Sequence, residues 1–135
     1  MAGADRALRF LTDTHAMLWW LRDDRRLSPR ARAFREDGAN ELLWSIASSW
    51  EVAVKLGIGK LELDLPLHRL FADIVSEQGA IVLPIGHEHC ALLADLPRHH
   101  RDPFDRMLIA QAQHERVPIL TADPKLAAYE VELVW

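Results

Sequence analysis

The stretch LRFLTDTHAMLWWL, residues 8–21, decides the fold that we expect, because it joins a short strand to a helix through an acidic turn. Leu8 to Thr12 has the composition of a buried strand, and His15 to Leu21 has that of a helix with large apolar side chains. Asp13 lies between the two. A strand that leads directly into a helix is typical of a parallel α/β sheet, so we expect the rest of the chain to repeat the pattern.

The remaining sequence alternates in the same way. Strands are predicted at residues 41–46, 80–84, 118–121 and 132–134, and helices at residues 29–37, 48–56, 67–78, 87–96 and 104–115. Ser28 followed by Pro29 is a typical helix start, and Gly57 and Gly79 are placed to end helices. The fold class is therefore α/β, with helices on both faces of a mostly parallel sheet of four to five strands.

Length and composition indicate one domain over residues 1–135. The chain carries 16 Lys and Arg against 20 Asp and Glu, a formal charge of −4, and half of its residues are hydrophobic. No apolar run reaches the roughly 20 residues that cross a bilayer, and the start MAGADRALRF does not resemble a secretory leader. Cys90 is the only cysteine, which excludes an internal disulfide and fits a reducing cytoplasm; we expect it to be a small core residue.

Four acids, Asp13, Glu51, Asp105 and Asp123, lie at or near predicted helix starts, and three of them follow strands. Each acid taken alone is well explained as a helix cap, because helix N-termini favour carboxylates. The capping groups would be Asp13 or Thr14, Ser48 with Glu51 as a capping box, Asp102 with Asp105, and Asp123 before Pro124.

The combination of the four acids points to a shared site. The carboxyl ends of parallel strands meet along one edge of a sheet, where ligands bind at the point at which strand order switches. Carboxylates brought together there repel one another unless a cation neutralises them. Oxygen ligands without a Cys or His signature suit Mg²⁺ or Mn²⁺, and carboxylate-held Mg²⁺ is a common apparatus for cutting phosphodiesters.

The same residues resemble the PIN domain, in particular the toxin ribonucleases of VapBC-type toxin–antitoxin pairs. The resemblance covers nearly the whole chain and rests on four blocks in order. These are LTDTHAMLWWL from residue 11, SIASSWEVAVKLGIGKL from residue 45, HRDPFDRMLIAQA from residue 100 and ILTADPKL from residue 119.

The resemblance implies a three-layer α/β/α sandwich and a Mg²⁺-dependent endoribonuclease that leaves a 3′-hydroxyl and a 5′-phosphate. It also implies a homodimer and a small antitoxin whose C-terminal segment would block the acidic site. Carried over by position, Asp13 and Asp105 would be direct metal ligands. Glu51 and Asp123 would contact the metal through bound water or would support the ligands without touching the ion. Asp102 is better explained as a helix cap than as a fifth acid.

Other functions stay open at this point. One is an RNA-processing or structure-specific nuclease of the same fold. Another is a noncatalytic binding module whose acidic groove binds a basic peptide. A phosphatase of the haloacid type is disfavoured, because it would need a second Asp two residues after the first, where this chain has His15.

Several further residues have a structural and a functional interpretation. Thr14, Ser48 and Thr121 could orient a carboxylate or cap a turn. His99 and His100 could approach a phosphate, although a surface loop is the simpler interpretation, and His15 is expected to bond locally. Trp50 could help to form a wall of the site. Arg106 could hold a phosphate or pair with an acid, and pairing is the more common arrangement. His87 and His89 do not form a convincing zinc pair.

Overall fold

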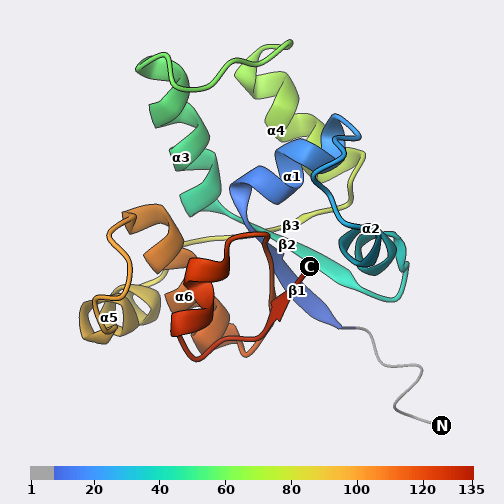
Figure 1. The fold of residues 1–135 in the computed structure, drawn as a ribbon. Coiled ribbons are helices and arrows are strands. Elements are labelled where there is room, and N and C mark those ends of the chain that lie inside the picture. The colour runs from blue at the N-terminus through green and yellow to red at the C-terminus, as the bar shows by residue number, and fades with distance from the viewer. Residues whose placement is uncertain (1–7) are drawn as a thin grey trace, which may run out of the picture.

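The computed structural model describes residues 8–135, so the expectation about a leader falls largely on residues outside that range. Five parallel strands form one sheet in the order β3-β2-β1-β4-β5 (Figure 1). The strands are β1 (Arg9–Thr12), β2 (Glu41–Ser45), β3 (Ile81–Leu83), β4 (Ile119–Leu120) and β5 (Leu133–Val134).

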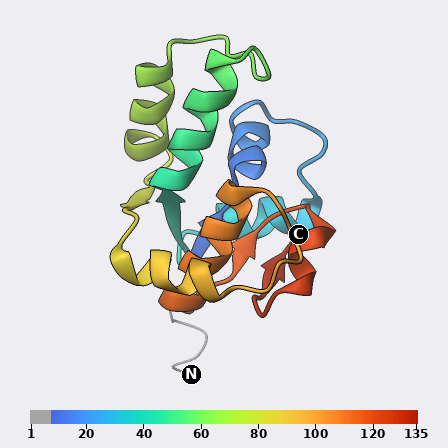
Figure 2. The same ribbon diagram turned by 90° about the vertical axis from the view of Figure 1, so that its left-hand side faces the viewer.

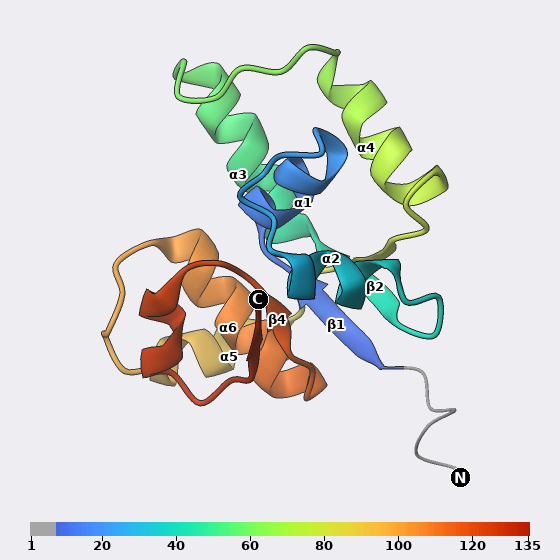
Figure 3. The ribbon, with the colours of Figure 1, turned by 45° about the vertical axis from the view of Figure 1, so that its right-hand side comes forward.

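Helices cover both faces of this sheet. They are α1 (Thr14–Leu21), α2 (Pro29–Glu36), α3 (Ile46–Gly57), α4 (Leu67–Ser76), α5 (His87–Asp95) and α6 (Pro103–Glu115), with a 3-10 helix, η2, at Pro124–Ala128. Figures 2 and 3 show α5 and α6 packed together on one side, with α1, α3 and α4 on the other. None of the helices within residues 8–135 has the length and apolar character that crossing a membrane requires.

Two apolar cores confirm the three layers. Along β1 and β2, successive side chains alternate between the faces of the sheet, as strand geometry requires. Phe10 and Leu42 join the core beneath α1, α2 and α4, whereas Leu11 and Leu43 join the core beneath α5 and α6. All four are at most 3% exposed. The sequence prediction of an α/β sandwich with a parallel sheet is therefore confirmed.

The strand order switches direction between β1 and β4, and this switch decides where a ligand can bind. Leu11 pairs with Ile119 and Thr12 pairs with Leu120 in the parallel register. The backbone N–H of Asp13 then donates to the carbonyl of Leu120 at 3.0 Å, which extends the pairing by one residue. Asp13 is thereby fixed at the carboxyl edge of the sheet, beside the residues that follow β4.

The start of α3 differs from the prediction. The helix begins at Ile46, directly after β2, because the Ser45 side chain caps it by accepting from the Ala47 N–H at 3.0 Å. The Ser45 hydroxyl also donates to Gln111 on α6, and Gln111 in turn donates to the carbonyl of Pro84 at 3.2 Å. The proposed Ser48–Glu51 capping box is therefore wrong, and Glu51 lies in the second turn of α3.

Candidate metal centre

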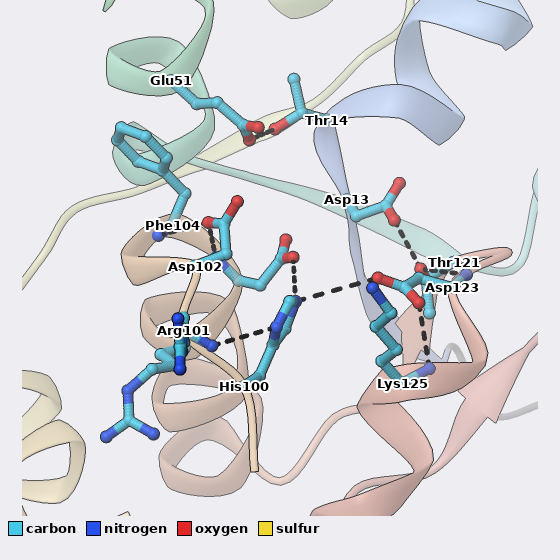
Figure 4. Close-up of polar contacts among 12 residues, drawn as sticks. Asp13, Thr14, Glu51, His100, Arg101, Asp102, Phe104, Thr121, Asp123 and Lys125 are labelled. Carbon is cyan, nitrogen blue, oxygen red and sulfur yellow. Dashed lines mark hydrogen bonds and ion pairs between the residues drawn. The ribbon is translucent and has the colours of Figure 1, made fainter. Parts of the chain in front are cut away.

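The four acids predicted from the sequence line one cavity of about 340 Å³ at the carboxyl edge of the sheet. Asp102 and a single basic residue, Lys55, line it as well, as do His15, Trp19 and Ala122. Figure 4 shows that the carboxylates come from different elements and converge: Asp13 follows β1, Glu51 lies on α3, Asp102 precedes α6 and Asp123 follows β4. The fold thus brings together residues 110 positions apart in sequence.

Asp13 combines a structural and an electrostatic role. One carboxylate oxygen accepts the Ala16 N–H at 2.8 Å and caps α1, and the other accepts the Thr121 hydroxyl proton at 2.5 Å. The carboxyl group is buried, and this desolvation raises its pKa from 3.8 to about 6 despite the two hydrogen bonds. The nearby charges of Glu51 and Asp123 raise it further. The interpretation of Asp13 as a helix cap is therefore confirmed. Asp13 also lines the acidic cavity.

Glu51 is 3% exposed and has a protein partner on each oxygen. Oε1 accepts the Thr14 hydroxyl proton at 2.6 Å, and Oε2 lies 2.5 Å from the Lys55 ammonium, one helical turn further along α3. Thr14 therefore orients a carboxylate of the cavity. Ser48 stands one turn earlier on α3, and its hydroxyl is buried without a hydrogen-bond partner among the described residues. The Lys55 ammonium is thus the ionic partner of this buried carboxylate.

Asp105 projects from the first turn of α6 and does not cap it. Asp102 is the cap, since one of its oxygens accepts the N–H groups of Phe104 at 2.9 Å and of Asp105 at 3.0 Å. The expectation for Asp102 is thus confirmed. Burial, followed by the charge of Asp102, raises the pKa of Asp105 well above its usual range. Its carboxylate is left to face the cavity.

His100 contacts the acids more closely than the sequence suggested. Its Nδ1 accepts the Arg101 N–H at 3.1 Å, so the ring proton lies on Nε2 and is donated to Asp105 at 2.8 Å (Figure 4). The same nitrogen lies 3.9 Å from an oxygen of Asp123. The interpretation of His100 as a plain surface-loop residue is wrong. The only sign of this contact in the sequence is that His100 precedes Asp105 by five residues. The path of the loop turns the ring toward the acids, and this path leaves no pattern in the sequence.

Asp123 caps the 3-10 helix that follows β4. One of its oxygens accepts the Lys125 N–H at 2.9 Å, and its own N–H donates to the Thr121 hydroxyl at 3.1 Å. Thr121 therefore links two acids of the cavity, because the same hydroxyl donates to Asp13. His100, Asp105 and Asp123 each present one ligand atom within 4.8 Å of the others.

The donor set fits a hard divalent cation. The cavity concentrates five carboxylates against one ammonium, and burial together with the charges of neighbouring acids raises the pKa values of Asp13 and Asp105. Carboxylate oxygens are the ligands that Mg²⁺ and Mn²⁺ prefer. A bound dication would offset the repulsion that these side chains otherwise carry.

Several minor expectations need correction. Trp50 is 57% exposed and packs edge-on against Phe104, with ring centroids 5.0 Å apart, so it stands outside the cavity lining. His15 lines the cavity instead of only bonding locally. Cys90 is exposed, because it lies on the outer side of α5. Arg106 pairs with no acid within residues 8–135; its guanidinium donates to backbone carbonyls and to the Tyr129 hydroxyl.

A second group of possible ligands has a structural explanation. Glu88, His89 and His114 also bring ligand atoms within 4.8 Å of one another. However, Nδ1 of the buried His89 accepts the Gly86 N–H at 3.0 Å, and Nε2 lies 3.2 Å from Glu115. With both ring nitrogens occupied, His89 caps α5 and ties it to the end of α6.

Known structures with the same fold extend over nearly the whole chain. FitAcB from Neisseria gonorrhoeae is 19% identical, covers 92% of this chain and 95% of its own, and superposes with a TM-score of 0.63. VapBC2 from Rickettsia felis, bound to a DNA fragment from its promoter, is 10% identical over 93% and 97% of the two chains, with a TM-score of 0.67. A toxin–antitoxin complex from Klebsiella pneumoniae is 14% identical over 89% and 92%, with a TM-score of 0.56.

At these identities the structural likeness shows the fold alone, and none of the curated proteins is significantly similar to the sequence. The family is shown by the sequence model of the PIN domain, which matches residues 10–132. The match runs from β1 to the residue before β5. The chain belongs to the PIN domain family.

Proposed function

We propose that this protein is a Mg²⁺-dependent endoribonuclease and the toxin of a VapBC-type pair, with one nuclease domain over residues 1–135 acting in the cytoplasm. The observation that carries the proposal is the convergence of Asp13, Glu51, Asp105 and Asp123 on one cavity at the switch point of a PIN-domain sheet. Mn²⁺ would serve in place of Mg²⁺, because both favour oxygen ligands.

Each residue has a defined part in the proposed site. Asp13 and Asp105 would hold the ion, and Glu51 and Asp123 would act behind them or through water. Thr121 and His100 hold the Asp13 and Asp105 carboxylates in place by donating hydrogen bonds to them. When bound, the dication would acidify a water and neutralise charge on the leaving oxygen, so that no protein nucleophile is needed. RNA would be left with 3′-hydroxyl and 5′-phosphate ends, as the resemblance implies.

The proposal includes protein partners. A small antitoxin would insert its C-terminal segment into the cavity, where the excess of carboxylates favours a basic side chain. A homodimer is supported by a row of exposed apolar side chains along one face of α3. The row consists of Ile46, Trp50 and Val54, and it continues at Ile58 directly after the helix, with a spacing of four residues throughout. Apolar side chains gathered on one helix face favour contact with another protein.

The proposed activity is tested by incubating the purified full chain with a panel of transfer, ribosomal and messenger RNAs in Mg²⁺. We expect internal cleavage that leaves 5′-phosphate ends and stops when EDTA is added. Single-stranded DNA of the same sequence serves as the matched control and should be cut more slowly. Absence of cleavage in both Mg²⁺ and Mn²⁺, together with tight binding of a basic peptide, would instead establish the noncatalytic module.

A further inference from the structure

A second cavity, of about 410 Å³, is lined by basic side chains: Arg98, His100, Arg101 and Arg106. Its position is set by the loop that leads into α6, the helix that carries Asp105. This concentration of positive charge is unexpected in a chain whose formal net charge is −4. An anionic ligand would neutralise this charge.

The three arginines of this basic cavity have no carboxylate partner among residues 8–135. The Arg106 guanidinium is fixed by the carbonyls of Pro97 at 2.8 Å, Leu93 at 3.3 Å and Leu96 at 3.4 Å. These acceptors are neutral, so they orient the guanidinium and leave its charge uncompensated. Like charges held together in this way repel one another, and an anion bound between them would relieve the repulsion.

His100 connects the lining of the basic cavity to that of the acidic one. Its Nε2 donates to Asp105 in the acidic cavity, and its Nδ1 accepts the N–H of Arg101. Figure 4 shows the Arg101 guanidinium on the opposite side of His100 from Asp123 and directed away from the carboxylates. The two cavities are therefore linked by the hydrogen bond from His100, which lines the basic cavity, to Asp105, which lines the acidic one.

We propose that the basic cavity binds a backbone phosphate of the RNA strand next to the phosphate that is cut. This subsite deepens the proposed nuclease function and rests on it. A dication among the acids would attract only the phosphate that it contacts, while the acidic surroundings repel the rest of the strand. Arginine suits the neighbouring phosphate because its planar guanidinium donates two parallel hydrogen bonds to a pair of phosphate oxygens.

The test measures binding of a fluorescent single-stranded RNA to the full chain by anisotropy at several salt concentrations. The Asp13→Asn substitution is present throughout so that the RNA is not cut. Adding Arg98→Gln and Arg101→Gln should weaken binding at least about 10-fold and reduce the salt-dependence slope by about 0.7 to 1.4, as expected when one or two phosphate contacts are lost. Both arginines are exposed, and the fold of each variant is checked by circular dichroism.

The matched control replaces Arg25 and Arg30 by glutamine, which removes the same charge from an exposed region away from the basic cavity. Equal effects of the two pairs on the slope would show a general attraction and overturn the subsite. Displacement by polyglutamate as effective as that by RNA would also overturn it, in favour of an acidic peptide. The nuclease function is judged separately, because it fails only if the wild-type chain cuts no RNA in Mg²⁺.

Discussion

The Asp13→Asn variant is expected to lose Mg²⁺-dependent RNA cleavage by at least about 1,000-fold, which corresponds to about 4 kcal/mol of lost transition-state stabilisation. The same loss is expected for Asp105→Asn. Asparagine has nearly the shape of aspartate but lacks the charge that would hold a dication, so the ion would bind weakly or in the wrong place. Single-turnover cleavage of an RNA that the wild-type chain cuts, measured over a range of Mg²⁺ concentrations, gives the comparison.

The substitution at position 13 should leave the fold in place. Asparagine is as good a helix cap as aspartate, so its side-chain oxygen can still accept the Ala16 N–H that starts α1. Its amide nitrogen can donate to the Thr121 hydroxyl, reversing the direction of the hydrogen bond that Asp13 accepts. A loss of cleavage in a variant with unchanged circular dichroism would therefore report the missing charge.

The matched control is Asp95→Asn, the same chemical change at an exposed acid at the end of α5, outside the acidic cavity. It should cut RNA at the wild-type rate. Wild-type activity in the Asp13 or Asp105 variant would show that these acids do not hold the ion, and the assignment of the site would have to be abandoned.

The second large effect concerns stability in the absence of metal. The folded state raises the pKa of Asp13 from 3.8 to about 6, so it holds the proton more tightly than the unfolded chain does. The resulting stabilisation is complete below about pH 4 and is lost as the pH rises through 6. Asp13 alone should lower the free energy of unfolding by about 1 kcal/mol between pH 5 and pH 8, out of about 3 kcal/mol over the whole range.

Urea denaturation in EDTA at pH 5 and pH 8 measures this difference. Asp13→Asn should remove most of Asp13's share of the pH dependence, since its side chain does not titrate, and it should be more stable than the wild-type chain at pH 8. Mg²⁺ should stabilise the wild-type chain more at pH 8 than at pH 5, because protons and the cation compete for the same carboxylates. Identical pH profiles for the two proteins would contradict a buried Asp13 whose pKa is raised in the folded state.

The layers of the fold could be predicted because each element carries a local signal. Strand residues such as Phe10 and Leu11 alternate between the two cores. Ser28 caps α2, and Pro29 occupies the first position of this helix. The start of α3 was misplaced because two serines, Ser45 and Ser48, can each cap a helix. The choice of Ser45 depends on the buried Gln111 contact, which joins residues 66 positions apart and leaves no local pattern.

The acids of the site could be predicted for a similar reason, since parallel strands carry the residues at their ends to a common edge. What could not be predicted is how each carboxylate is held. The sequence does not show that Thr14 holds Glu51, that Thr121 joins Asp13 to Asp123, or that His100 turns inward. These contacts depend on loop paths and on side-chain directions, so they follow from the folded geometry and not from spacing alone.

The measurement closest to the central claim is a crystal structure of the full chain grown at pH 8 with Mn²⁺, whose anomalous scattering locates the ion without ambiguity. We expect a peak in the acidic cavity, coordinated by Asp13 and Asp105, with Glu51 and Asp123 bound to it directly or through water. A cavity without an anomalous peak, in which each acid contacts only its present protein partners, would contradict the account.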